Sequence, residues 1–376
     1  MKLGQNTFSD FNMSLTEKKL VIFGASDYLK LIDRNFRDLK LSERASYIVD
    51  NAVEKQGRKF NLTGDNLDVF SPVLLKNENA DEIVLLIAAT SYAWEIYQLL
   101  EKDEHYSNVV CFFLMYLIAE HSDDNRDLTD RVNKNQVNQE KSPVIPPKIH
   151  CFWFSGGGKD DLSKRCLDSW RIACPDYEII EWNTDNYDVS KNPYMYEAFK
   201  KRKWAFVTDY ARLDVLYRYG GFYFDLDVEL YRDLDPLRFH DFVIGFGPYR
   251  DIEAAAFGTR QENGFVRELL DIYQDRVFDW EKVLAGEIQP VYMNVEFIKK
   301  GFLMNGKYQE KGGITIYPKE VFSDRDPFTE EIIKSSSAIG VHHCAGGWWT
   351  NDSRNKHEMA KNSMEKIKSL YGGVGE

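Results

Sequence analysis

The chain has 376 residues, enough for two ordinary domains with a sizeable hydrophobic core. Hydrophobic residues make up 43% of it, and its formal net charge of −12 argues against binding to nucleic acid, which requires basic surface patches. The five cysteines are scattered and form no C-x-x-C pair, so we expect reduced thiols rather than a disulfide framework or a zinc site.

The first part of the chain predicts an α/β unit. Residues 1–16 are polar, lack a signal-peptide core and are expected to form a flexible leader. Over residues 17–120, short apolar strands that end near Gly24, Asp50 and Ala89 alternate with helical patterns, which is typical of a parallel sheet.

This first unit resembles the Rossmann-like domain of bacterial sugar-modifying enzymes, because Asp50-Asn51 and the following Gln56-Gly57 match its signature. The G-x-G-x-x-G fingerprint is absent, since Gly24 is followed by Ala and Ser, so a phosphate-binding turn is doubtful. Asp50 could hold a ribose. Nucleotide binding and a structural or docking role both stay open, because a fold alone does not fix function.

Residues 121–145 are polar and charged and predict a linker, and residues 146–376 form the expected second domain. The longest apolar run, 109–119, has eleven residues and is too short to span a bilayer. We therefore expect no transmembrane segment. We expect a cytoplasmic protein, and peripheral contact with the inner face of the membrane is compatible with this location.

The second domain opens with an apolar strand that runs into the glycine-rich loop at Ser155-Gly156-Gly157. Phe152 and Trp153 lie at the end of this strand. An aromatic ring there can stack on a base, and glycines let the backbone approach a ligand. The alternative is that Trp153 is an ordinary core residue, since buried aromatic residues are common.

The segment before the glycine pair 220–221 predicts a helix, because Leu213, Leu216 and Tyr217 recur at helical spacing. Thr208 or Asp209 can cap its start, and the glycine pair 220–221 can end it in the left-handed conformation.

Asp209 and Arg212 stand at i and i+3 and share a face of this helix. They could form a surface ion pair of little energetic value. They could instead provide a carboxylate for a sugar hydroxyl beside a guanidinium that reaches sugar or phosphate oxygens.

Two carboxylates follow the helix inside an apolar, aromatic strand. Side chains alternate along a strand, so Asp225 and Asp227 are expected on one face and Phe224, Leu226 and Val228 on the other. Unpaired buried carboxylates are costly, and a hard divalent cation such as Mg²⁺ removes that cost. An isolated D-x-D more often marks a solvated strand end or a turn, so its context decides.

Near the C-terminus stands His342-His343-Cys344-Ala345-Gly346-Gly347-Trp348-Trp349. Imidazole is a good ligand for a transition metal such as Mn²⁺ and can also donate to a diphosphate. The alternative is that these histidines are satisfied structural residues.

Three segments together resemble glycosyltransferase family 32. Residues 209–227 match the pattern D-x-x-R-x-x-x-L-x-x-x-G-G-x-Y-x-D-x-D of its DXD-containing sugar-binding region. The segments around 146–157 and 339–349 are similar to its opening I-P-K-x-I-H-x-x-W-x-G-G and its closing A-I-H-H-x-A-G-S-W. Relatives include fungal initiating mannosyltransferases, bacterial capsule glycosyltransferases and, more distantly, clostridial glucosylating toxins. Gly347 departs from the pattern, which has Ser there.

The resemblance implies an α/β fold in which a GT-A-type nucleotide-diphospho-sugar transferase domain follows the smaller Rossmann-like domain. It also implies a retaining, metal-dependent hexosyltransferase. The donor would be a UDP- or GDP-linked sugar and the acceptor a glycan or lipid-linked glycan, in bacterial capsular or other surface polysaccharide synthesis.

The same resemblance implies roles for single residues. Asp227 would bind Mn²⁺ or Mg²⁺ most directly, and Asp225 would hold ribose or sugar and share the metal shell. His342, or else His343, would be a further ligand.

Arg212 would stabilise charge on the departing diphosphate, and Asp209 would orient the donor sugar. Trp153, next to Phe152, would stack on the base, and Trp348 would reach the leaving phosphate.

Two other function classes stay open. One is an oxidoreductase or epimerase centred on the first unit, against which the missing glycine fingerprint counts. The other is a non-catalytic nucleotide-sugar or glycan-binding scaffold, which the lost hydroxyl at Gly347 favours and the complete acidic set disfavours.

Overall fold

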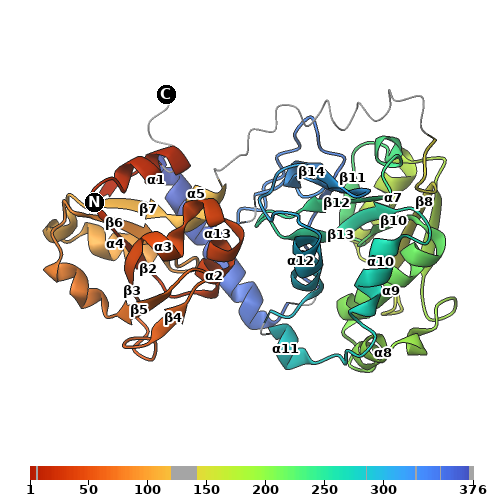
Figure 1. Ribbon diagram of the computed structural model, residues 1–376, viewed down its shortest axis with the longest axis horizontal. Coiled ribbons are helices and arrows are strands. Elements are labelled where there is room, and N and C mark those ends of the chain that lie inside the picture. Colours follow the sequence, from red (N-terminus) through yellow and green to blue (C-terminus); the bar gives the residue numbers. More distant parts are fainter. Residues whose placement is uncertain (6, 120–141, 285, 327, 348, 372–376) are drawn as a thin grey trace. The chain divides into compact units, whose positions relative to one another are not determined.

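The computed structural model describes residues 1–5, 7–119, 142–284, 286–326, 328–347 and 349–371. The chain divides into two compact units (Figure 1). Unit 1 comprises Met1–Asp123, Asp326–Thr329 and Trp349–Glu376, and unit 2 comprises Asp124–Arg325 and Glu330–Trp348.

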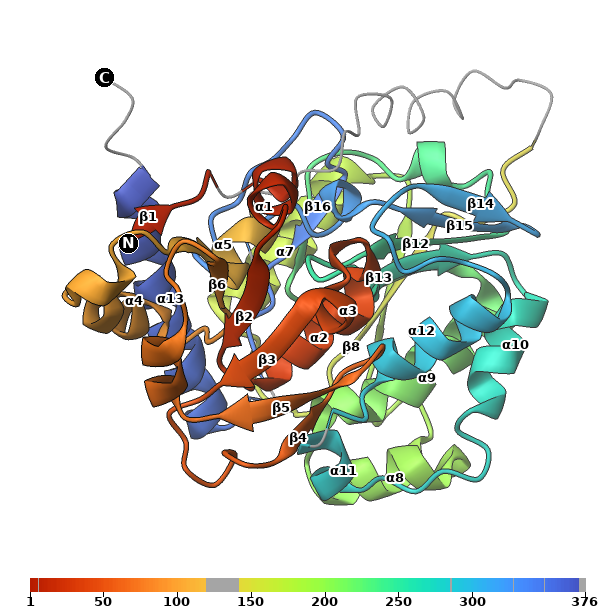
Figure 2. The same cartoon turned by 60° about the vertical axis from the view of Figure 1, so that its left-hand side comes forward.

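Within its described residues, unit 1 is a seven-stranded sheet with the order β1-β7-β6-β2-β3-β5-β4, seen from a second direction in Figure 2. Its strands are β1 (Lys2–Leu3), β2 (Lys19–Phe23), β3 (Ala45–Val49), β4 (Lys59–Asn61), β5 (Asn66–Phe70), β6 (Ile83–Ile87) and β7 (Val110–Phe113). Its helices are α1 (Phe8–Ser14), α2 (Asp27–Asn35), α3 (Leu41–Arg44), α4 (Ala93–Glu101), α5 (Leu114–Ala119) and α13 (Asn351–Tyr371). The pairs are parallel except β4 with β5.

The central strands of unit 1 are apolar nearly throughout, as expected for a parallel sheet that is covered on both faces. The strand order reverses at β2, where the chain turns at Gly24 with φ +112°. Beside this turn, the Asp50 carboxylate accepts the N–H groups of Ala25 and Ala52, each at 2.8 Å, and pairs with Lys55 at 3.1 Å. Asp50, which the sequence offered as a ribose ligand, is thus engaged by its own chain.

Three expected boundaries differ from the structure. Residues 1–16 are not a loose leader, because β1 pairs with β7 and α1 buries Phe11 completely. The end of the expected second domain, 146–376, falls in unit 1, because α13 packs on α4 and α5. Most of the expected linker 121–145 lies outside the described residues, and Ile145 is buried in unit 2.

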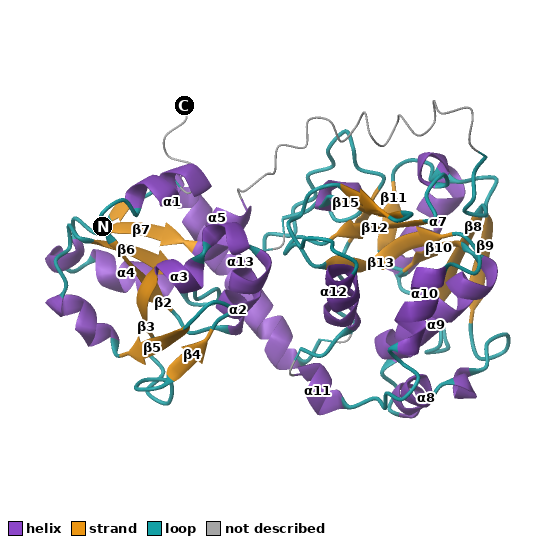
Figure 3. Ribbon diagram, viewed as in Figure 1, coloured by secondary structure: helices purple, strands orange, loops and turns teal. Residues whose placement is uncertain are grey.

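Unit 2 has a mixed sheet with the order β14-β15-β12-β13-β10-β8-β9 in its described part. These strands are β8 (Lys148–Phe152), β9 (Glu178–Trp182), β10 (Gly221–Phe224), β12 (Phe242–Phe246), β13 (Ile252–Thr259), β14 (Gln309–Lys311) and β15 (Ile314–Tyr317). A small antiparallel pair, β11 (Val228–Leu230) and β16 (Gly340–His342), lies beside it. The helices are α7 (Asp161–Ala173), α8 (Pro193–Lys200), α9 (Trp204–Tyr219), α10 (Gly264–Asp271), α11 (Trp280–Leu284) and α12 (Gln289–Lys299) (Figure 3).

Strand β10 separates two hydrophobic cores. Tyr223 belongs to the core that α8, α9, α10 and α12 share, whereas Phe222 and Phe224 belong to the core beneath α7, which contributes Trp170. The alternation of side chains expected for this strand therefore holds as far as Phe224. The chain is a mixed α/β protein, and the Rossmann-like and GT-A classes stay predictions.

Helix α9 ends where the sequence predicts, at Gly220 with φ +61°. The prediction that Thr208 or Asp209 caps the start of the helix is wrong. The helix begins about one turn earlier, at Trp204, and both residues lie buried inside it. Phe206 and Val207 are core residues, and burying them favours the longer helix.

Gly258 on β13 lies opposite Phe222 on β10, and a Cβ built on it would approach the Phe222 ring at 2.4 Å. We expect Gly258→Ala to destabilise the protein by about 1–3 kcal/mol through overpacking. The midpoint of urea unfolding measures this. Gly264→Ala is the matched control, because a Cβ there meets nothing within 4 Å. Equal midpoints for the two variants would contradict the close approach.

Candidate functional site

The two aspartates of the D-x-D motif stand in a turn. Strand β10 ends at Phe224, and Asp225-Leu226-Asp227 leads into β11 with the Val228 N–H donating to the Asp225 carbonyl at 3.0 Å. Asp225 and Asp227 lie together as expected, and Phe224, Leu226 and Val228 pack in or against one core. The expected cause, strand alternation, is wrong, because the strand ends before Asp225. The turn itself brings them together.

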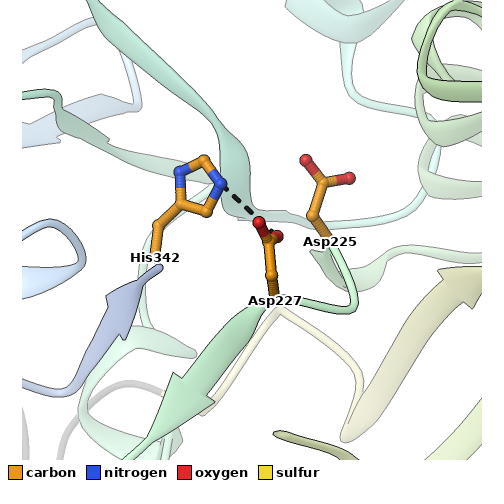
Figure 4. A group of neighbouring side chains, drawn as sticks. All are labelled: Asp225, Asp227 and His342. Atoms are coloured by element: carbon orange, nitrogen blue, oxygen red, sulfur yellow. Dashed lines mark ion pairs between the residues drawn. The ribbon is translucent and has the colours of Figure 1, made fainter. Parts of the chain in front are cut away.

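Asp225, Asp227 and His342 form one group, whose candidate ligand atoms all lie within 4.8 Å of one another (Figure 4). His342 comes from β16 and lies opposite Val228 in the β11–β16 pair, so backbone pairing brings its imidazole to the turn. Its Nε2 lies 3.4 Å from Oδ1 of Asp227. This set of two carboxylates and one imidazole suits a divalent ion such as Mn²⁺.

The two carboxylates differ in charge behaviour. Burial opposes ionisation of Asp227, but the His342 imidazole and the Ala345 N–H, 2.9 Å from Oδ2, hold the pKa of Asp227 well below its usual value. Burial raises the pKa of Asp225, although Arg212 lies 3.6 Å from its Oδ1. The buried Tyr223 hydroxyl also donates to Asp225. A bound cation would favour the ionised form of both carboxylates.

The Arg212 guanidinium is buried and engaged by its own chain. Nη1 donates to the Ala254 carbonyl at 2.7 Å, Nε donates to the Thr208 carbonyl at 3.1 Å, and Nη2 donates to Thr208 Oγ1 at 2.7 Å. Nη2 also lies 3.5 Å from Asp209 and 3.6 Å from Asp225. The surface ion pair considered above is therefore wrong. These contacts fix Arg212 between the two carboxylates.

Asp209 lies inside α9 and is 6% exposed. Its Oδ2 accepts the Tyr194 hydroxyl at 3.2 Å, and its backbone carbonyl accepts Nε2 of Gln289 at 2.6 Å. Burial raises the pKa of Asp209 to about 7, against the attraction of Arg212. This carboxyl can therefore hold or release a proton near neutral pH.

The structure does not bring His343 into the group. Its Nε2 lies 2.9 Å from Oε2 of Glu229 and 3.4 Å from Nη2 of Arg165, on the other side of the β11–β16 pair from His342 by strand alternation. The prediction that His343 is a metal ligand is therefore wrong, and His342 is the candidate ligand.

The aromatic candidates occupy different surroundings. Phe152 is 7% exposed and packs against Phe154, Tyr187 and Tyr223, so it belongs to the core, and its contact with a nucleotide stays a prediction. Trp153 is half-buried, and its Nε1 donates to the Gly157 carbonyl at 3.1 Å. That bond fixes the indole beside the glycine-rich loop, and base stacking by Trp153 stays a prediction.

The closing segment is described in part. Trp348 lies outside the described residues. Gly347 is exposed, and a Cβ built on it meets nothing within 4 Å. A serine would therefore fit at this position.

Sequence reasoning missed one member of the surroundings, Glu253 on β13. Its Oε1 lies 3.2 Å from Nδ1 of His342. The sequence feature that could have identified Glu253 is its charge at the start of a wholly buried strand, directly before Ala254–Ala256.

The five cysteines are free thiols, as expected.

Across the described ranges, no helix combines the length and apolar character that crossing a bilayer requires.

Comparisons with known proteins concern mainly this region. Residues 160–243 match the family model of the glycosyltransferase sugar-binding region containing the DXD motif. Inositol phosphoceramide mannosyltransferase 3 of Schizosaccharomyces pombe is 30% identical over 115 residues, which are 29% of this chain and 31% of that protein. The match thus spans less than a third of the curated relative.

Among solved structures, the PaToxG glycosyltransferase aligns with 65% of this chain and 93% of its own, at 14% identity and a TM-score of 0.32. The family match contains Asp209, Arg212, Asp225 and Asp227, whereas His342 lies beyond it. The chain is glycosyltransferase-like and has a DXD sugar-binding region.

The raised pKa of Asp209 predicts a pH-dependent stability. Between its ordinary value of 3.8 and its folded value of about 7, the unfolded chain ionises while the folded chain keeps the proton. Stability from this group is therefore complete at low pH and is lost as the pH rises through that interval. A difference of this size corresponds to roughly 4 kcal/mol at most.

We expect wild type to lose more stability than Asp209→Asn between about pH 4 and pH 7, because only wild type carries this group. Urea unfolding over a pH series measures both slopes. Asp176→Asn, at an exposed position, is the control and should follow wild type. Parallel slopes for wild type and Asp209→Asn would contradict the assignment.

Proposed function

We propose that this protein is a metal-dependent, retaining glycosyltransferase that moves a hexose from a nucleotide diphosphate sugar to a glycan or lipid-linked glycan. The observation that carries the proposal is the meeting of Asp225, Asp227 and His342 within 4.8 Å, from the D-x-D turn and a distant strand. The bacterial surface-polysaccharide role and the UDP- or GDP-linked donor belong to the same proposal.

The donor set fits a divalent ion. Two carboxylates supply the hard oxygen ligands that Mg²⁺ and Mn²⁺ prefer, and the imidazole adds a nitrogen that favours Mn²⁺. The contacts of Asp227 hold it ionised and therefore ready to bind a cation. When bound, the ion supplies positive charge against the leaving diphosphate.

The chain's own residues orient this site. Arg212 and the Tyr223 hydroxyl both contact Asp225, so its carboxylate is held in one orientation. Asp209, with its pKa near neutral, is the candidate to bond a hydroxyl of the donor sugar. Trp153 is the candidate surface for the base.

The other enzyme class has less support. An oxidoreductase or epimerase centred on unit 1 would need the turn after β2 to bind a phosphate. The N–H of Ala25 in that turn already bonds Asp50. A scaffold that binds nucleotide sugars without transfer is separated from the proposal by activity.

The metal role of Asp227 is tested with its alanine variant. We expect Mn²⁺ to raise the melting temperature of wild type in the presence of one class of nucleotide sugar, because a ligand of the folded state stabilises it by mass action. At a ligand concentration of 100 times Kd this amounts to about 2.7 kcal/mol. Asp227→Ala should lose the shift and sugar transfer.

Asp176→Ala is the control, since it removes an exposed carboxylate elsewhere on unit 2. Undiminished transfer by Asp227→Ala would rule out the metal role. A metal-dependent shift without transfer to any glycan would favour the scaffold.

Gly347→Ser tests the departure from the family pattern. The variant should melt at the wild-type temperature without ligand, because the added atoms meet open space. We expect a larger Mn²⁺-dependent shift with nucleotide sugar, because a hydroxyl adds an oxygen donor. Titrations of both proteins with Mn²⁺ measure this, and identical curves would show that position 347 does not face the metal.

A further inference from the structure

Glu253 is a buried carboxylate whose partners converge on the site. It lies on β13, whose residues are all buried, and it is 9% exposed. Such a group requires hydrogen-bond or charge partners. Oε1 accepts the Ala255 N–H at 3.2 Å, and Oε2 accepts the Ser323 hydroxyl at 2.6 Å. Oε1 also lies 3.2 Å from Nδ1 of His342.

The two nitrogens of His342 face different carboxylates. Nε2 lies 3.4 Å from Asp227, and Nδ1 lies 3.2 Å from Glu253. Figure 4 shows the nitrogen that faces Asp227, with the second nitrogen on the other side of the ring. A histidine that binds a metal almost always donates its other N–H to a carboxylate, a carbonyl or water, which fixes the ring and its tautomer.

The segment that holds Glu253 is also bonded to the strand that carries His342. Ser323, which holds Oε2 of Glu253, forms a β-bridge with Val341, and the His342 N–H donates to the Phe322 carbonyl at 2.8 Å. The segment that orients the glutamate is therefore bonded to the strand that carries the histidine. The backbone bonds of residues 322–323 to β16 therefore fix the Ser323 hydroxyl, which holds Glu253, relative to His342.

We infer that Glu253 is the positioning residue of the metal site: it accepts the Nδ1–H of His342 and so leaves Nε2 as the ligand atom. This inference rests on the proposed function, because it needs a cation at Asp225 and Asp227. Glu253 does not touch the cation. It acts through the orientation of His342 and raises the basicity of the bound nitrogen.

Cys344 is the competing partner, since its Sγ lies 3.3 Å from Nδ1 of His342. A thiol sulfur is a weak hydrogen-bond acceptor, whereas a carboxylate oxygen is a strong one. Glu253 therefore determines the orientation, and Cys344→Ala provides the matched control from the same side of the ring.

The experiment measures Mn²⁺ alone on the full chain. Electron paramagnetic resonance of free Mn²⁺ gives the affinity, and the pulsed spectrum of bound Mn²⁺ reports a directly bound nitrogen. Wild type should show the nitrogen coupling and His342→Ala should lose it. Glu253→Ala should bind Mn²⁺ about 10–100-fold more weakly, with the coupling reduced.

Glu253→Gln keeps an oxygen acceptor for Nδ1–H without the charge. It should keep the nitrogen coupling and lose less affinity than Glu253→Ala, which a merely structural role would not predict. Cys344→Ala should match wild type in both readouts. If Glu253→Ala does not fold, Ser323→Ala tests the same path, with a smaller loss of affinity expected.

Wild-type affinity and coupling in a folded Glu253→Ala, or in both Glu253→Gln and Ser323→Ala, would overturn the positioning role and leave the proposed function standing. An equal loss in Cys344→Ala would also overturn it. Absence of Mn²⁺ binding by wild type would overturn the metal site itself and, with it, this inference.

Discussion

Repulsion between buried carboxylates is the constraint around which unit 2 is organised at the ends of β10 and β13. Two cationic or potentially cationic side chains separate four carboxyl groups. Arg212 lies between Asp209 and Asp225, and His342 lies between Asp227 and Glu253. Since like charges in a buried site cannot all ionise without compensation, some of these groups keep protons until positive charge arrives. A divalent ion would supply the charge that this arrangement lacks.

The residues that manage this charge are fixed by the secondary structure. The hydrogen bonds of Arg212 reach the backbone of α9 at Thr208 and of β13 at Ala254, so one guanidinium ties helix to sheet. The imidazole is fixed by the pairing of β11 with β16. Side chains that are locked by such contacts hold a site more tightly than side chains on loops.

The sequence was most informative where a local rule applied throughout. Helical spacing and the glycine pair predicted the end of α9 at Gly220. The family resemblance offered His342, or else His343, as a partner of Asp225 and Asp227, and the structure groups them with His342. The same rules failed at their limits. Strand alternation does not extend past Phe224, because the backbone turns at Asp225. The prediction of a helix cap at Thr208 or Asp209 was also wrong. It relied on capping propensity alone, which does not account for the burial of the preceding apolar residues Phe206 and Val207.

Contacts between residues distant in sequence were not predictable from local patterns, which is why the packing of α13 in unit 1 and the contact of Glu253 with His342 were missed. Such contacts also set an order of events during synthesis. Ala345, whose N–H bonds Asp227, follows it by 118 residues. At ordinary rates of translation this interval lasts roughly 6–24 s. During that time the nascent chain carries the aspartate pair without the strand that brings the imidazole, so the group of Asp225, Asp227 and His342 cannot form until this interval has passed.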